Sequence, residues 1–254
     1  MKAIGFISIK GGCGKSSLAI LTARHLVGQG KKVLFIDADV QNSASFYFIP
    51  TGDEPERRNI ARAMMEGDLM GNIIPIAEYP NLDLIPSHFN LLKLRGISVR
   101  TLSVAMAQVK NDYDYVIVDS APTLDNIVLN VARAVDVIIT PCAPATFDWK
   151  TTKFLKDQLV SEIDDEVLNK WHVLRNMRTF SRTDSPDALA TRYDDLLGDT
   201  FGRHLMDTKI LDTAFVTQAI DFRAPVTPKG KSAKLHQGLV KLIEETIGSE
   251  ALHG

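Results

Sequence analysis

Residues 3–17, AIGFISIKGGCGKSS, predict a strand, a glycine-rich turn and the first turn of a helix. Glycines in such a turn let backbone N–H groups point inward around a phosphate chain, and the helix N-terminus adds its partial positive charge. The lysine of the loop reaches the β- and γ-phosphates, and the hydroxyl after it ligates Mg²⁺. We therefore expect ATP and Mg²⁺ to bind at residues 10–17, which are Lys10, Gly11, Gly12, Cys13, Gly14, Lys15, Ser16 and Ser17.

Short β-rich runs recur along the chain, and helical segments separate most of them. They cover residues 3–9, 32–37, 82–86, 115–119, 135–141 and 171–177, with a weaker run at 206–211. Several are apolar at consecutive positions, which is typical of strands covered by helices on both faces. The pattern predicts a single α/β domain over residues 1–254, a doubly wound, mostly parallel sheet with helices on both faces.

Charged side chains follow or end several of these predicted strands. In doubly wound sheets, ligands bind beyond the carboxyl ends of the strands. We therefore expect Lys10, Asp37, Asp39 and Asp119 to converge at that edge.

The phosphate loop departs from the general pattern GxxxxGK[ST] at its first glycine, because that position is Ile9. It carries instead a second lysine, Lys10, directly after the strand. This resembles the deviant phosphate loop of the ParA/MinD group of P-loop ATPases, and most closely that of small ParA proteins. The resemblance implies that Lys10 reaches across an ATP-dependent homodimer to the partner's phosphates, where a cation stabilises developing charge. A solvated surface lysine is the alternative.

The second strand ends in residues 37–41, DADVQ, which resemble the DxDPQ element of ParA proteins with Val40 in place of proline. Two carboxylates at positions i and i+2 of a strand end point the same way. The resemblance implies that Asp37 lies near the Mg²⁺ shell and that Asp39 positions the attacking water. Asp39 thus joins Lys10 and Lys15 as a predicted catalytic residue, although a turn-forming pair of aspartates would have the same sequence.

The run at 115–119 ends in Asp119, which resembles a Walker B aspartate followed by the family's DxPP switch, with Ala121 in place of the first proline. Asp119 would hold Mg²⁺ through water. The predicted metal residues are therefore Ser16, Asp37 and Asp119. An aspartate that merely ends a strand beside a turn is the alternative.

Two further segments resemble parts of small ParA proteins. Residues 141–144 (PCAP) and 147–149 (FDW) are similar to a stretch that is usually a dimer surface. Asn176, at the end of a strand, is implied as an adenine contact. A buried Trp149 without a partner and an ordinary strand-end asparagine fit the sequence equally well.

The composition excludes several classes of protein. A net charge of -2 and a pI near 6.3 mean that any nucleic-acid contact must come from a local patch. Cys13 and Cys142 are too few for a disulfide framework or a four-cysteine metal site in one chain, which favours a reducing, cytoplasmic location. No apolar run is long enough to span a membrane, so we expect a soluble protein.

One segment, residues 203–241, is locally basic, with seven Lys or Arg against three Asp and a net charge of +4. Such a face suits salt-sensitive phosphate contacts that ignore base sequence, although an ordinary solvated surface would also carry these charges. The charged residues are Arg203, Lys209, Arg223, Lys229, Lys231, Lys234 and Lys241, with Asp207, Asp212 and Asp221.

Together these features favour a ParA-like partition ATPase. Its ATP-bound homodimer would bind DNA non-specifically and be released when a ParB-like or other partner stimulates slow ATP hydrolysis. Plasmid segregation, chromosome segregation and cargo positioning on the nucleoid all use such a cycle. Because Lys2 enters the first strand at once, we expect no N-terminal helix-turn-helix of the kind that larger plasmid ParA proteins carry.

Three other functions fit the sequence less well. A MinD-like membrane ATPase would end in a basic amphipathic helix, whereas here the final apolar stripe is followed by Glu244, Glu245 and Glu250, so we expect that helix to pack on the domain. An electron-transfer ATPase like the nitrogenase iron protein needs two cluster cysteines per subunit, and Cys13 lies inside the phosphate loop. Small-molecule synthetases such as dethiobiotin synthetase lack a lysine at the position of Lys10.

Overall fold

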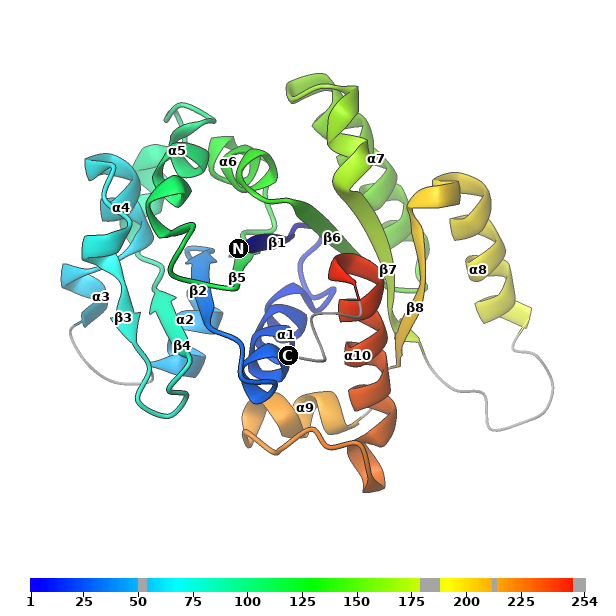
Figure 1. Ribbon diagram of the computed structural model, residues 1–254. Coiled ribbons are helices and arrows are strands. Elements are labelled where there is room, and N and C mark those ends of the chain that lie inside the picture. The colour runs from blue at the N-terminus through cyan, green and yellow to red at the C-terminus, as the bar shows by residue number, and fades with distance from the viewer. Residues whose placement is uncertain (50–53, 179–187, 212–213, 249–254) are drawn as a thin grey trace.

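The chain folds around one eight-stranded sheet, shown in Figure 1. The computed structural model describes residues 1–49, 54–178, 188–211 and 214–248. The strands lie in the order β3-β4-β2-β5-β1-β6-β7-β8, and every neighbouring pair is parallel except β3 with β4. They are β1 (Lys2–Phe6), β2 (Val33–Ala38), β3 (Ile74–Pro75), β4 (Leu82–Ile85), β5 (Tyr115–Ser120), β6 (Val137–Cys142), β7 (Trp171–Arg178) and β8 (Leu205–Leu211).

Helices cover both faces of this sheet, which confirms the predicted doubly wound, mostly parallel α/β fold (Figure 1). One apolar core lies under α4 (Ile60–Glu66), α5 (Thr101–Met106), α6 (Asn126–Ala134), α7 (Thr146–Glu162) and α8 (Ala188–Phe201). The other lies under α1 (Lys15–Gly28), α2 (Ser43–Phe48), α9 (Ala214–Asp221) and α10 (Ala233–Ile247). A short helix, α3 (Glu54–Arg57), precedes α4.

One predicted boundary was wrong, and one strand was missed. The first strand ends at Phe6 and not at Ile9, because the chain leaves the sheet after Ile7, whose N–H still bonds to the Ile139 carbonyl at 3.0 Å. Helix α1 begins at Lys15, where the loop sequence predicts that the helix opens. The antiparallel edge strand β3 was missed, since two residues are too short to show a pattern.

The parallel register brings the ends of the central strands together. Asp37 of β2 lies beside Asp119 of β5, and Asp119 lies beside Phe6 of β1. Strand β1 stands between β5 and β6, where the chain changes direction across the sheet. Ligands of doubly wound sheets bind at such a point.

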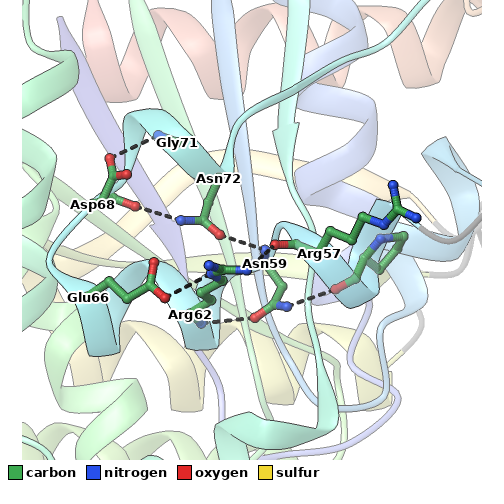
Figure 2. A network of polar contacts seen from close by, with 8 residues as sticks. Arg57, Asn59, Arg62, Glu66, Asp68, Gly71 and Asn72 are labelled. Atoms are coloured by element: carbon green, nitrogen blue, oxygen red, sulfur yellow. Dashed lines mark hydrogen bonds and ion pairs between the residues drawn. The ribbon is translucent and has the colours of Figure 1, made fainter.

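Figure 2 shows a polar network that fixes the start of α4. Asn59, which is 3% exposed, caps the helix by accepting from the Arg62 N–H, and its side chain donates to the Pro55 carbonyl at 2.8 Å. Its own N–H donates to the Asn72 side chain, which in turn donates to the Asp68 carbonyl. Each buried polar group of Asn59 therefore has a partner, and α4 is firmly attached to the turn before β3.

The final helix, α10, packs on the sheet as expected, since Leu235, Leu239, Leu242 and Ile243 are all buried. The carboxylate of Glu245 accepts two backbone N–H groups and a hydroxyl from β8. The acidic end of this helix therefore contributes to the fold. Glu250 lies outside the described residues.

Candidate nucleotide and magnesium site

The loop between β1 and α1 has the backbone of a phosphate cradle. Gly12 and Gly14 have positive φ angles of 76° and 89°, which side chains other than glycine rarely adopt. A Cβ on Gly14 would also lie 2.5 Å from the Asn176 amide nitrogen. Gly11 and Gly12 are exposed, and no atom lies within 4 Å of a Cβ added to either, so a ligand can approach the backbone there.

Helix α1 presents an uncapped N-terminus to this loop. No side chain caps it, and its first turn holds no acidic residue, so its first N–H groups are available to an anion. Lys15 is only 6% exposed, and its ammonium donates to the Lys10 carbonyl at 3.4 Å. Ser16 and Ser17 follow in the first turn and are half-buried. The loop therefore combines a lysine, hydroxyls and free backbone donors, as the sequence predicts for phosphate binding.

The three predicted carboxylates are all buried beside this loop. Asp37 and Asp119 are fully buried and Asp39 is 6% exposed. The Asp37 carboxylate accepts from the Asp39 N–H at 3.1 Å, and the Asp39 carboxylate accepts from the Gln41 N–H at 2.9 Å. These bonds orient both side chains of the Asp37–Asp39 turn.

Burial shifts the titration of each of these carboxylates. It raises the pKa of Asp37 to about 6, against the opposing effect of hydrogen bonds from Ser45 and Asp39. It raises the pKa of Asp119 well above its usual range, and the neighbouring charge of Asp37 raises it further, while Ser16 and Lys15 lower it. Burial also raises the pKa of Asp39, which the Gln41 hydrogen bond and the Lys15 charge lower. A cation bound here would offset this cost of ionisation.

The Asp119 carboxylate is the feature of the site that best fits Mg²⁺. Both oxygens of Asp119 are buried, and neither has a hydrogen bond of standard geometry within the described part of the chain. No three His, Cys, Asp or Glu side chains in the described ranges form a complete metal site. Mg²⁺ commonly takes one or two carboxylates and completes its shell with phosphate oxygens and water, so an open Asp119 beside Ser16 suits it.

Lys10 lies at the entrance to the loop and is half-exposed. Its N–H donates to the Ser8 hydroxyl, and its carbonyl accepts from the Cys13 thiol. Its ammonium lowers the pKa of Asp148, which burial raises more strongly. Lys10 therefore acts electrostatically on the first turn of α7, where Asp148 is 7% exposed.

A cavity of about 210 Å³ adjoins the loop on the side of α9. Asn176 lines it and is 4% exposed, and its amide donates to the Cys13 carbonyl at 2.7 Å. Cys13 itself is buried. The remaining walls are Gly14, Ser17, Leu18, Met177, Ile210, Val216, Thr217, Ile220 and Asp221. A cavity of this size beside a phosphate loop, lined by both apolar and polar side chains, suits a purine base.

The sequence interpretation missed the contribution of α9 to this cavity. Val216, Thr217 and Ile220 lie about 200 residues after the loop in the chain, and no spacing rule connects them to it. It also missed Ser45, which looks like an ordinary helix residue, and it included Asp148 only as part of the 147–149 stretch that resembles a dimer surface. The one local signal for Ser45 is the short helix that follows the DADVQ turn within a few residues.

The basic segment 203–241 is partly neutralised. Lys209 forms an ion pair with Asp194 at 2.8 Å, and Arg223 pairs with Glu78. Lys229 and Lys231 are exposed on the turn before α10. Asp212, which entered the predicted charge of this segment, lies outside the described residues.

No helix within the described ranges combines the length and the hydropathy that a bilayer span requires.

Trp149 is partly buried, and its indole N–H donates to the Thr200 hydroxyl of α8 at 2.8 Å. This residue therefore has a packing role within the chain.

Comparison with known proteins agrees with this geometry. Residues 1–170 match the family model AAA_31, described as an AAA domain. The virulence plasmid ParA family protein pGP5-D of Chlamydia psittaci is 26% identical over 98% of this chain and 97% of its own length. Among solved structures, the ATP complex of a McdA variant from Cyanothece has a TM-score of 0.84 at 21% identity, over 98% of this chain and 96% of that one. A plasmid partition protein of Borrelia burgdorferi B31 bound to AMPPNP has a TM-score of 0.76 at 23% identity, over 97% and 99% of the two chains.

Proposed function

Since the chain belongs to the AAA_31 family of AAA domains and is a P-loop ATPase of the ParA/MinD type, we propose that it is a partition or positioning ATPase. In this proposal it binds Mg²⁺ and ATP, forms an ATP-dependent homodimer and binds DNA without sequence preference. Partner-stimulated hydrolysis of ATP then ends each cycle.

The observation that carries the proposal is the convergence of Lys15 with three buried carboxylates at the carboxyl ends of β1, β2 and β5. The charge of Lys15 acts on both Asp39 and Asp119. A fold does not need such a cluster for stability, because buried ionised groups cost free energy unless they are compensated. A bound cation and a phosphate chain would provide that compensation.

The residues of the site would then have distinct roles. Lys15 and the N–H groups of residues 11–16 hold the phosphates, and Ser16 and Asp119 hold Mg²⁺, with Asp37 beside them. Bound Mg²⁺ would neutralise charge on the phosphates during transfer. Asp39 positions the attacking water, and its raised pKa is compatible with accepting a proton from it. Asn176 and the wall of α9 hold the adenine base.

Lys10 is proposed to act between two subunits. It is half-exposed at the start of the loop, and its charge acts on Asp148 of α7. In the homodimer its ammonium would reach the phosphates bound by the partner subunit and stabilise the charge that develops there. ATP would in this way link dimerisation to hydrolysis.

The exposed lysines of residues 229–231 are proposed to contact DNA phosphates. They follow α9, which forms a wall of the base cavity, and the intervening Pro225 and Val226 line a pocket with the C-terminal end of α1. The binding partner that stimulates hydrolysis would be a ParB-like or comparable protein, and the cargo a plasmid, a chromosome or a protein assembly. The protein would act in the cytoplasm and associate with the nucleoid when ATP is bound.

A MinD-like membrane cycle is the second candidate, because the same nucleotide site would serve it. The packing of α10 on the sheet disfavours it, since the apolar stripe of that helix is already buried.

Calorimetric titration with ATP, with and without Mg²⁺, tests nucleotide binding. Wild-type protein should bind ATP more tightly with Mg²⁺, and Lys15→Ala should show no measurable binding while retaining its fold by circular dichroism. Normal ATP affinity in Lys15→Ala would contradict the assigned site.

A further inference from the structure

Ser45 of α2 is bonded directly to one of the proposed magnesium-site carboxylates. Its hydroxyl and its backbone N–H both donate to the same oxygen of Asp37, each at 2.7 Å. Ser45 is 5% exposed and Asp37 fully buried, so water does not compete for these bonds. Hydrogen bonds to a buried carboxylate are short and strong in such surroundings.

The Ser45 hydroxyl also accepts a hydrogen bond, from the Ser87 N–H at 2.8 Å. Ser87 follows the end of β4. The residue before it, Pro86, accepts from the N–H of Ile60 at the start of α4 at 2.9 Å, and the polar network around Asn59 fixes that helix end (Figure 2). Ser45 therefore joins Asp37 to a rigid part of the sheet edge.

The two carboxylates that face each other across β2 and β5 are held very differently. Asp37 accepts three hydrogen bonds, two from Ser45 and one from the Asp39 N–H. Both oxygens of Asp119 lack a hydrogen bond of standard geometry in the described part of the chain. One carboxylate is thus oriented by the protein, while the other is open to a ligand.

We infer that Ser45 is the positioning residue for Asp37 in the magnesium site, through the buried relay Asp37–Ser45–Ser87. This inference rests on the proposed function, because it assumes that the site binds Mg²⁺ with ATP. The hydroxyl fixes the rotamer of Asp37, which lies beside Asp119, and so would orient this carboxylate for Mg²⁺ bound there. Loss of the hydroxyl removes a donor from Asp37 and leaves the buried Ser87 N–H unpaired.

Loss of the Ser45 hydroxyl should weaken Mg²⁺ binding without weakening Mg²⁺-independent ATP binding. Partners that orient metal-site carboxylates typically contribute about 10–100-fold to metal affinity. In Ser45→Ala, the Mg²⁺ concentration that half-saturates the Mg²⁺-dependent gain in ATP affinity should rise by about 10-fold or more. The affinity for ATP in EDTA should equal that of the wild-type protein, because Ser45 does not contact the phosphate loop. A general loosening of the fold would weaken binding under both conditions.

Two matched variants serve as controls. Ser43→Ala changes an exposed serine of the same helix. Ser87→Ala removes a buried hydroxyl that has no hydrogen-bond partner among the described residues. This second variant keeps the backbone N–H of residue 87, which donates to the Ser45 hydroxyl. Both should titrate with Mg²⁺ like the wild-type protein. If Ser45→Ala does not fold, Ser45→Thr and Ser45→Val test the role of the hydroxyl, because threonine and valine have the same shape and only threonine carries one. The threonine variant should keep the wild-type Mg²⁺ midpoint, and the valine variant should shift it.

Four outcomes would overturn the inference. A wild-type Mg²⁺ midpoint in Ser45→Ala, or identical midpoints for the threonine and valine variants, would remove Ser45 from the site. Equal weakening of ATP affinity with Mg²⁺ and in EDTA would leave it a purely structural role. No effect of Mg²⁺ on the wild-type protein would overturn the proposed function, and this inference with it.

Discussion

The carboxylates of Asp37 and Asp119 lie next to each other because the parallel register pairs these two residues across β2 and β5. Both are fully buried, and the charge of Asp37 raises the pKa of Asp119. The pair therefore resists full ionisation in the absence of a cation, as neighbouring buried acids generally do. Lys15 supplies one positive charge nearby, and a divalent ion would supply two more.

Lys10→Ala should separate nucleotide binding from dimerisation. Lys15 and the loop backbone remain, so the variant should retain some ATP binding, but the proposed contact with the partner's phosphates is lost. Sedimentation velocity with ATP should therefore show monomers, whereas the exposed-surface control Lys110→Ala should dimerise as the wild-type protein does. ATP-dependent dimers of Lys10→Ala at normal affinity would exclude the shared-site model.

Asp39→Ala should trap the ATP-bound dimer. Without the carboxylate that positions water, the hydrolysis rate should fall by about 100-fold or more, the usual size of a general-base contribution. Asp39→Asn is the matched variant, because its side-chain oxygen can still accept from the Gln41 N–H. Both variants should hydrolyse slowly and keep ATP-dependent dimers, and an unchanged phosphate-release rate in either would remove Asp39 from catalysis.

Lys229 and Lys231 should contribute to DNA affinity more than Lys209 does. Lys209 is already paired with Asp194, whereas the other two are exposed. Each of Lys229→Ala and Lys231→Ala should weaken binding to DNA of any sequence and reduce the slope of log affinity against log salt by about 1. Lys209→Ala is the comparison, and a larger loss there than at Lys231 would place the DNA face elsewhere.

His25 should make the stability of the protein depend on pH. Burial, and then the neighbouring His236, lower its pKa from 6.5 to about 4 in the folded chain. Between pH 4 and pH 6.5 the unfolded chain binds the proton more readily than the folded chain. The contribution of neutral His25 to the free energy of unfolding is therefore complete above pH 6.5 and is lost as the pH falls toward 4.

The measurement is urea unfolding of wild-type protein and His25→Gln at pH 7.5 and pH 5. On going from pH 7.5 to pH 5, the free energy of unfolding of the wild-type protein should fall by about 1 kcal/mol more than that of the variant. The difference is small because the His25 ring is partly exposed and solvent screens its charge. Equal losses in the two proteins would show that His25 does not carry the effect.

Much of this architecture follows from local sequence patterns. Runs such as residues 115–119 are apolar at consecutive positions, and glycines and a lysine follow β1, so the sheet type and the placement of residues 10–17 could be predicted. The spacing of Asp37 and Asp39 likewise indicated that both would lie at one strand end, which the structure confirms.

Other parts depend on contacts between distant segments, and these leave no periodic signal. The base cavity requires α9 to return beside the loop, and the Asp37–Ser45–Ser87 relay requires α2 to meet the end of β4. Lys209 and Arg223 could be counted as charges, but their pairing with Asp194 and Glu78 appears only in three dimensions. The net charge counted from the sequence of residues 203–241 therefore overstates how basic this segment is in the folded protein.

In the proposed cycle, ATP controls DNA binding. The most direct test is fluorescence anisotropy of a labelled DNA duplex of arbitrary sequence, titrated with protein in Mg²⁺ and either ATP or ADP, with anionic liposomes in a parallel sedimentation assay. We predict tight, salt-sensitive DNA binding with ATP, weak binding with ADP and no ATP-dependent binding to liposomes. Equal DNA affinity with the two nucleotides, or ATP-dependent binding to liposomes in place of DNA, would contradict the account.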